Sequence, residues 1–145
     1  MPGDYQNTHC ASVEVAGPAE TAYAFMADGM NQNHWALGSM NRRALGDNVF
    51  VGTSSFSGAE VYVKLVGHRD LLMVDYYIGP GPDALQPLVE ARIKPGLALG
   101  IGVDHSVIAL TIWRWLDATQ AEWELHYHIW RTEIYLIKSA IERGL

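Results

Sequence analysis

Histidine is the side chain that titrates nearest to neutral pH, and two histidines flank Tyr127 in the segment Glu124–His128. If this segment is a strand, His126, His128 and the Glu124 carboxylate face the same side. Together they could hold a metal ion or form an acid-base site, or they could be histidines of a surface or interface. A metal site needs further ligands, and the sequence has neither a cysteine cluster nor an HExxH motif. We therefore expect no metal here and keep His126 as a candidate acid or base.

Two other histidines and one arginine could also reach a substrate. His34 lies in the segment NQNHWALG, where it either ends a short helix or acts as a base. His105 ends the glycine-rich segment KPGLALGIGVDH and could close over a cavity as an alternative base. Arg114 is the only cation in an apolar stripe and could hold an enolate, phenolate or carboxylate oxygen, or it could lie at the rim. The candidate catalytic residues are thus His34, His105, Arg114 and His126.

Other kinds of chemistry lack their motifs. No GxSxG sequence is present, and Cys10 is the only cysteine, so an intramolecular disulfide is excluded. The segment GLALGIG has no Lys-Ser/Thr and opens no helix, which argues against a nucleotide site. The formal net charge of −6 argues against nucleic acid or an anionic membrane as the main partner. We expect no organic cofactor.

The elements that must position these residues are an apolar strand, two short helices, a long run of strands and one terminal helix. In chain order they cover residues 11–15, 18–29, 31–38, 48–129 and 131–144. Pro18 marks the start of the first helix, and helical spacing of apolar residues returns only in the last segment. This order predicts one α+β domain over residues 1–145, in which a curved antiparallel sheet wraps around the C-terminal helix.

The last two expected strands, 106–115 and 121–129, are joined by a short turn. A two-residue turn would pair Ile112 with Leu125 and gather an apolar face. The terminal helix needs such a face as cover, so we interpret it as the concave one. The alternative is that the opposite face, with His126, lines the site, since sequence alone does not fix the register.

The opposite face of these strands would carry two exposed tryptophans. Trp113 and Trp115 alternate onto the side that holds Glu122 and Glu124. This is more aromatic surface than a monomer usually exposes, and aromatic residues framed by charges are common at interfaces. We therefore expect a homodimer through this face, unless a glycine-rich loop covers it.

The segment VEVAGPAETAYAFMAD followed by NHWALG, the glycine-punctuated strands VFVGTSSFSGAEVYVKLVG and the closing helix resemble the START-like (SRPBCC) superfamily. This superfamily includes polyketide cyclases, lipid-transfer domains and Bet v 1-type proteins. The resemblance covers almost the whole chain and implies a helix-grip fold with an apolar ligand cavity between the sheet and the terminal helix. Fold analogy does not by itself assign a reaction.

A cavity of this kind would be lined by aromatic side chains of the concave face. The resemblance places Trp35 at the mouth or wall of the cavity, although it could instead be a core residue. Tyr76, Trp123 and Tyr127 face inward if the expected strands and their register hold. The candidate ligand-binding residues are therefore Trp35, Tyr76, Trp123 and Tyr127.

These observations favour an enzyme of the cyclase, dehydratase or isomerase type. It would act on an apolar, aromatic or polycyclic small molecule by cofactor-independent proton transfer. The alternatives are a non-catalytic carrier or sensor of a hydrophobic ligand, and an interaction module that uses the aromatic face. The N-terminal residues MPGDYQNTHC lack the pattern of a signal peptide, and no apolar run is long enough to span a bilayer. We expect a cytoplasmic location.

Overall fold

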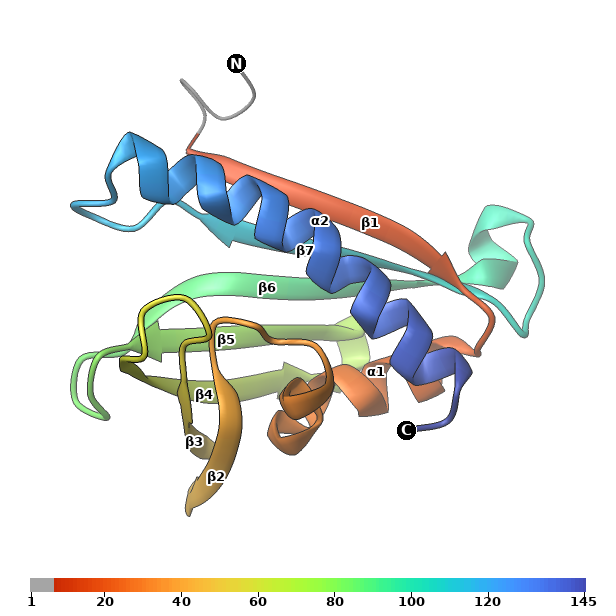
Figure 1. The fold of residues 1–145 in the computed structure, drawn as a ribbon. Helices are drawn as coiled ribbons and strands as arrows, with labels where there is room; N and C mark the ends of the chain where they lie inside the picture. Colours follow the sequence, from red (N-terminus) through yellow and green to blue (C-terminus); the bar gives the residue numbers. More distant parts are fainter. Residues whose placement is uncertain (1–6) are drawn as a thin grey trace.

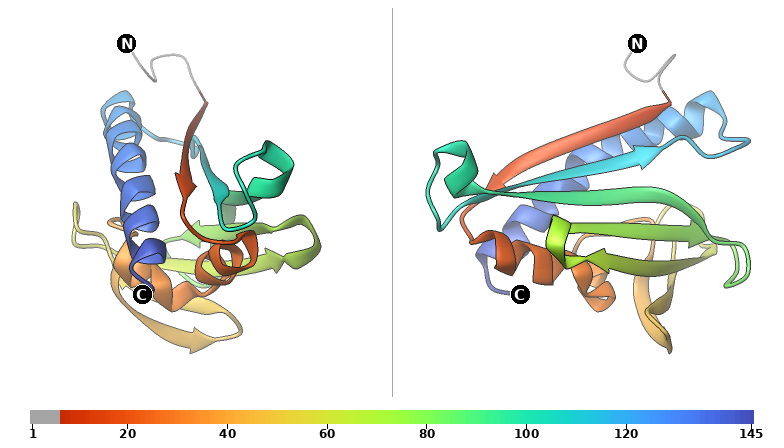
Figure 2. Two further views of the ribbon diagram at one scale, coloured as in Figure 1. Left: turned by 90° about the vertical axis from the view of Figure 1, so that its right-hand side faces the viewer. Right: turned by 180° about the vertical axis from the view of Figure 1, so that it is seen from behind.

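The structure is a computed structural model that describes residues 7–145. Its elements in chain order are β1 (Thr8–Val15), α1 (Ala19–Ala27), the 3-10 helix η1 (Gly29–His34), β2 (Met40–Gly46), β3 (Val49–Thr53), β4 (Glu60–His68), the 3-10 helix η2 (Arg69–Leu71), β5 (Met73–Gly79), β6 (Gln86–Pro95), the 3-10 helix η3 (Gly96–Leu99), β7 (Ser106–Trp113) and α2 (Gln120–Glu142). The strands form one antiparallel sheet in the order β1-β7-β6-β5-β4-β3-β2. The sheet curves around α2, which is the expected α+β helix-grip arrangement (Figure 1, Figure 2).

The two short helices after β1 pack against one end of the sheet. Pro18 precedes α1 in an extended conformation, and the helix buries Tyr23, Phe25 and Met26. The Asp28 carboxylate then accepts a hydrogen bond from the Met30 N–H at 3.0 Å and begins η1. These local signals turn the chain back so that the segment after η1 passes beside α2.

The terminal helix is longer than the sequence pattern suggests, because α2 begins at Gln120. The expected strand 121–129 is therefore wrong, and so is the pairing of Ile112 with Leu125; Ile112 pairs instead with β1. The reason is a capping box: the Thr119 hydroxyl accepts from the Glu122 N–H, and the Glu122 carboxylate accepts from the Thr119 N–H. No helix within residues 7–145 is long and apolar enough to cross a membrane.

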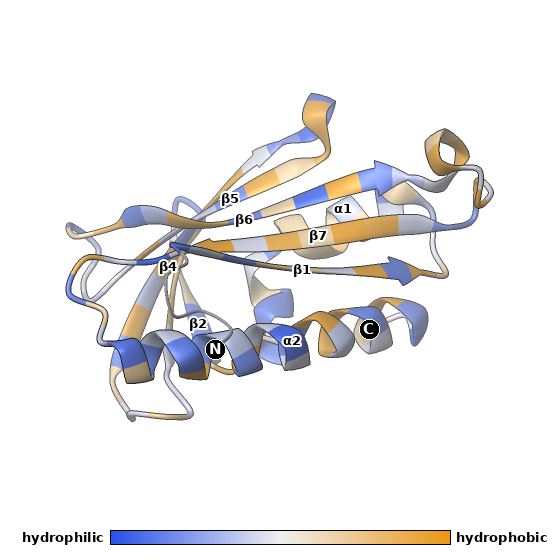
Figure 3. Cartoon of the chain, turned by 90° about the horizontal axis from the view of Figure 1, so that it is seen from above, coloured by the Kyte–Doolittle hydropathy of each residue, from blue (hydrophilic) through white to orange (hydrophobic). Residues whose placement is uncertain are grey.

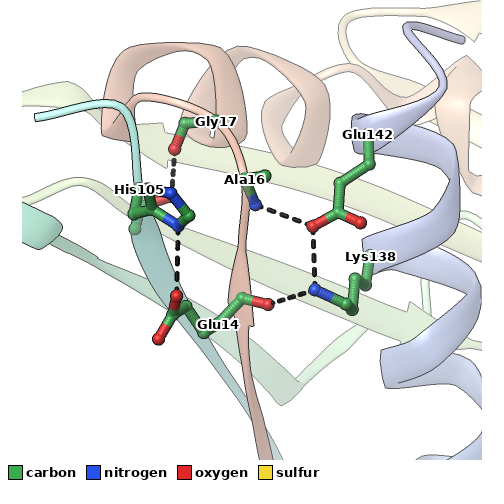
Figure 4. Close-up of polar contacts among 7 residues, drawn as sticks. Glu14, Ala16, Gly17, His105, Lys138 and Glu142 are labelled. Carbon is green, nitrogen blue, oxygen red and sulfur yellow. Dashed lines mark hydrogen bonds and ion pairs between the residues drawn. The ribbon is translucent and has the colours of Figure 1, made fainter. Parts of the chain in front are cut away.

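The C-terminal half of α2 is fastened to the free edge of β1 (Figure 4). The Lys138 ammonium donates to the Glu14 carbonyl at 2.8 Å, and the Glu142 carboxylate accepts from the Ala16 N–H at 2.7 Å. Lys138 and Glu142 also form an ion pair at 2.8 Å. These contacts satisfy backbone groups that an edge strand would otherwise leave unpaired.

The two halves of α2 differ in character. Figure 3 shows hydrophilic and hydrophobic residues along the whole helix, with more hydrophilic ones in its N-terminal part. Ile134, Ile137 and Ile141 are buried in the core. The N-terminal half also buries Trp123, Ile129 and Trp130, but it lies over the sheet without filling the space beneath it, and the cavity described below is found there.

The two tryptophans expected on the outer face are separated. Trp113 ends β7 with 46% of its surface exposed, and its indole N–H donates to the Glu90 carboxylate at 3.3 Å. Trp115 lies beyond the end of the strand and packs inward, edge-on to Trp123 and His126. The expectation of two tryptophans on one outer face is therefore wrong, because the strand alternation stops at Trp113.

Candidate functional site

A cavity of about 980 Å³ lies between the concave face of the sheet and the N-terminal half of α2. Its size falls at the upper end of the range for small-molecule sites. The sheet supplies mainly apolar side chains, and α2 covers them from the other side. The sheet residues that line it include Val61, Val63, Tyr76, Ile78, Leu88, Val89 and Ile112, and those of α2 are Glu122, Leu125, His126, Ile129, Trp130 and Glu133.

Loops from three places in the chain meet at the end of the sheet where α2 begins (Figure 1). They are residues 54–59, 80–85 and 114–119. Phe56 and Leu116 on two of these loops line the cavity and are 50% and 82% exposed. The cavity therefore opens through an apolar mouth, and the segment after β5 contributes Pro80 and Ala84 to its lining.

The second glycine-rich segment, residues 94–105, lies at the opposite end of the sheet (Figure 1). It folds as η3 and a turn, and none of its residues lines the cavity. The expectation that His105 closes over the cavity is wrong: its Nδ1 lies 3.1 Å from the Glu14 carboxylate (Figure 4). The segment returns the chain from β6 to β7.

Glu133 is the one buried acid among residues 7–145, with 3% of its surface exposed, and it lines the cavity. Its Oε2 atom accepts a hydrogen bond from the Leu37 N–H at 2.7 Å, and the carboxyl also bonds the Gly38 N–H. Burial outweighs these bonds and raises the pKa of Glu133 to about 8. At neutral pH this side chain is a neutral acid that can donate a proton.

His126 lines the same cavity seven residues earlier on α2, which places it on the same side of the helix as Glu133. Its Nδ1 lies 3.0 Å from the Glu122 carbonyl oxygen. Because a carbonyl only accepts, Nδ1 carries the hydrogen and Nε2 is the nitrogen able to take a proton. Burial lowers the pKa of His126, so the imidazole is a neutral base at pH 7.

His128 does not accompany His126 into the cavity. Residues two apart on a helix point about 200° apart, and His128 is exposed. The expectation that both imidazoles share one side of a strand is therefore wrong. Among the residues that the structure describes, no three His, Cys, Asp or Glu side chains lie close enough to hold a metal ion.

Two of the expected ligand-binding residues line the cavity. Trp35 and Tyr76 meet edge-to-face with ring centroids 6.1 Å apart. The Tyr76 hydroxyl donates to the Met26 carbonyl at 2.6 Å, and burial raises its pKa. Tyr76 therefore offers its ring rather than its hydroxyl to a ligand, whereas the Trp35 N–H has no hydrogen-bond partner among residues 7–145.

The remaining candidate residues predicted from the sequence do not line the cavity. His34 is exposed on η1, with its ring centroid 6.5 Å from that of Phe25. Arg114 donates to the Gln120 side chain and the Ala118 carbonyl, so it holds the turn before α2. Trp123 is fully buried and stacks on His9. Tyr127 lines a smaller hollow of about 340 Å³ with Thr8, His9, Cys10, Trp130 and Arg131.

Of the residues that line the cavity, Trp35, Tyr76 and His126 are predicted from the sequence, whereas Glu133 is not. An acid within the apolar stripe of the terminal helix, directly before Ile134, was the signal that could have identified it. Gln32 and Ser39, which line the cavity beside Trp35, are not predicted either. No local pattern marks these two residues.

No protein-family model and no curated protein matches the chain by sequence. Solved structures resemble it over almost its whole length. A START superfamily protein from Mycobacterium smegmatis superposes with a TM-score of 0.71 at 12% identity, covering 97% of this chain and 100% of that chain. The Zhui aromatase/cyclase from Streptomyces sp. R1128 gives 0.67 at 14%, covering 94% and 93%. The Aha1 dimer from Colwellia psychrerythraea gives 0.66 at 14%, covering 96% and 98%. The chain thus has the START-like helix-grip fold.

Proposed function

We propose that this protein binds an apolar, aromatic or polycyclic small molecule in the cavity and rearranges it by cofactor-independent proton transfer, as a cyclase, dehydratase or isomerase. One observation carries this proposal: burial shifts the pKa values of Glu133 and His126 in opposite directions on one side of α2. A neutral acid and a neutral base face the same cavity at pH 7. Pairs of groups whose pKa values are driven apart in this way commonly divide the acid and base roles.

The two groups suit a substrate larger than one ring. Seven residues rise roughly 10 Å along an α-helix, so Glu133 and His126 reach different parts of a bound molecule. His126 Nε2 would take a proton from an acidic C–H group, and Glu133 would donate one to a carbonyl or departing hydroxyl oxygen. The conjugated rings between them would carry the electron pair from carbon to oxygen. This is general acid-base catalysis on a polycyclic frame.

The structural relatives support two versions of this proposal. The likeness to an aromatase/cyclase favours an enzyme. The likeness to a START superfamily protein suits the alternative, a carrier or sensor whose cavity only holds the ligand. The acid-base pair favours the enzyme, because a carrier does not need a buried carboxyl group, whose ionised form burial penalises.

Anthrone is a suitable probe for this reaction, because its C10 hydrogens and its carbonyl oxygen lie on opposite sides of the central ring. Removal of a C10 proton by His126 and protonation of the oxygen by Glu133 gives anthrol, and the reverse reaction in D₂O places deuterium on C10. We expect the protein to accelerate this exchange. His126→Gln and Glu133→Gln should each lower the rate by roughly 10²–10⁴-fold with little change in anthrone affinity.

Matched controls lie on the same helix. Glu124→Gln and His128→Gln make the same chemical changes at residues that do not line the cavity, and they should leave the exchange rate unchanged. Binding of anthrone without any exchange would favour the carrier. If the His126→Gln and Glu133→Gln variants exchange the C10 hydrogen at the rate of the parent protein, these residues are not the base and the acid.

We also propose a homodimer that forms through the outer face around Trp113. The exposed ring beside the Glu90 carboxylate is an aromatic residue framed by charge, as interfaces commonly are. The dimeric state of the Aha1 relative supports this proposal.

A further inference from the structure

One corner of the cavity is rich in hydrogen-bond donors that have no partner within the part of the chain that the structure describes. We call it the donor corner and define it as Gln32, Trp35, Ser39 and Arg42, which lie on η1, on β2 and between them. Each of these side chains is buried, with 2–5% of its surface exposed. Gln32, Trp35 and Ser39 line the cavity, and Arg42 lies behind them, bonded to the Gln32 side chain.

The unpaired groups of the donor corner are the Trp35 indole N–H, the Ser39 hydroxyl and the Nη2 group of Arg42. Gln32 uses its oxygen to accept from Arg42, which leaves its amide N–H group for a ligand. Of these groups only the Ser39 hydroxyl can also accept a hydrogen bond. Buried polar groups are almost always satisfied, so donors left free by the protein beside a cavity favour a ligand that brings an acceptor.

Within residues 7–145, Arg42 also has no negatively charged partner. Its guanidinium donates to the Gly29 and Ser39 carbonyls and to the Gln32 amide oxygen. None of these three acceptors carries a charge. Burial lowers the pKa of Arg42 only to about 10, so the group stays a cation at neutral pH. A buried cation without a counter-ion is costly, and a charged ligand would remove this cost.

The acids near the cavity do not supply that counter-ion. Glu133 is neutral at pH 7, because burial raises its pKa to about 8. Glu60, Asp117 and Glu122 line the cavity but are exposed on or beside the loops of its mouth. A negatively charged ligand group in the donor corner would therefore contact the hydrogen-bond donors of Gln32, Trp35 and Ser39 and lie near the cation of Arg42 behind them.

We propose that the ligand of this cavity carries an anionic oxygen, a carboxylate or an ionised enol or phenol, and that this oxygen binds in the donor corner. The inference rests on the proposed function and narrows the substrate class to acidic aromatic or polycyclic molecules. The apolar body of the ligand extends from the donor corner along Val63 and Ile112. Hydrogen bonds from these donors to a charged oxygen are stronger than those to a neutral one.

The test compares probes that share one ring system: 2-naphthoate, the neutral ketone 2-acetonaphthone, 2-methylnaphthalene and the cation 2-naphthylmethylammonium. Their dissociation constants are measured by calorimetry at pH 7. We expect 2-naphthoate to bind about 10-fold or more tightly than 2-methylnaphthalene, as one or more hydrogen bonds to a charged group would give. This order would hold although the chain has a net charge of −6, which by itself favours the cation.

Three conservative variants locate the effect. Trp35→Phe, Ser39→Ala and Gln32→Leu each remove a hydrogen-bond donor. Each should raise the dissociation constant of 2-naphthoate by about 3- to 10-fold and leave that of 2-methylnaphthalene unchanged. Trp123→Phe is the matched control, because its indole N–H is also buried and unpartnered but Trp123 does not line the cavity. This control should bind both probes as the parent does.

The outcomes separate this inference from the proposed function. Equal affinity of the parent for 2-naphthoate and 2-methylnaphthalene, or the tightest binding for the cation, would overturn the inference and leave the apolar cavity in place. An equal loss of 2-naphthoate affinity in Trp123→Phe would also overturn it. If none of the four probes binds, the proposed function fails and the inference fails with it.

Discussion

Glu133 gains its chemistry from its surroundings rather than from its sequence neighbours. It is buried on α2 and held by the N–H groups of Leu37 and Gly38, so it also fastens the segment after η1 to the helix. Its raised pKa makes the folded protein bind a proton that the unfolded chain releases near pH 4.5. The stability that this proton contributes is therefore complete below about pH 4.5 and is lost as the pH rises through about 8.

This linkage predicts how stability depends on pH. Between pH 5 and 8 the Glu133 proton should contribute a fall in the free energy of unfolding of up to roughly 1.4 kcal/mol per pH unit. His9 and His126 act in the opposite direction, because burial lowers their pKa values and their contribution is lost on acidification. We therefore compare urea denaturation of the parent and Glu133→Gln at pH 5, 6, 7 and 8.

The difference between the two proteins isolates Glu133, since both keep the histidines. The parent should lose stability relative to Glu133→Gln as the pH rises. Glu124→Gln, at a half-buried residue of the same helix that does not line the cavity, should follow the parent. A constant difference between the parent and Glu133→Gln over this range would show that Glu133 keeps an ordinary pKa.

At the scale of elements, α2 shows what sequence patterns could and could not predict. Strand β1, the helix after Pro18, the long run of strands and the isoleucine stripe of the last helix all follow from periodicity. The pattern of the N-terminal half of α2 predicts a strand, because Trp123, Leu125, Tyr127 and Ile129 alternate with polar residues. The capping box at Thr119 was the local signal for a helix start.

The strand-like pattern in the N-terminal half of α2 limits how much of the site the sequence can predict. His126 is predicted as a site residue because histidine titrates near neutral pH in any element. Trp35 and Tyr76 are predicted because the pattern of their segments agrees with the structure. Glu133 and the donor corner depend on which groups burial leaves unpaired, and that is a tertiary property. No periodicity encodes it.

The cap of α2 can be tested directly. Thr119→Ala removes the hydroxyl that accepts from the Glu122 N–H at 3.1 Å and should lower the free energy of unfolding by about 0.5–2 kcal/mol. Fraying of the first turns would also move Leu125 and His126 and weaken ligand binding. Urea denaturation and calorimetry with 2-naphthoate measure the two effects.

Thr132→Ala is the matched control, since this exposed hydroxyl donates to the His128 carbonyl within the helix. Its removal should change stability by less than the Thr119 substitution and leave ligand affinity unchanged. Equal effects of the two substitutions would contradict a special role for the cap.

At the scale of the whole molecule, the sheet turns one face to the cavity and the other outward. The outer face carries Trp113, and we predict a homodimer there. Sedimentation at micromolar concentration should give twice the mass of the chain, and Trp113→Ser should give a monomer. Leu97→Ser, a matched change at an exposed residue of η3, should remain a dimer. A monomeric parent at this concentration would show that the prediction is wrong.

A ligand that occupies the cavity and reaches the donor corner would report itself through the tryptophan side chains. The most direct measurement is a titration with 2-naphthoate followed through the indole N–H signals of the five tryptophans in a ¹⁵N–¹H correlation spectrum. We expect a large shift of the Trp35 signal, because its N–H gains an acceptor, and no shift of the Trp113 and Trp123 signals. Saturable binding that leaves the Trp35 signal in place and shifts Trp113 or Trp123 instead would contradict it.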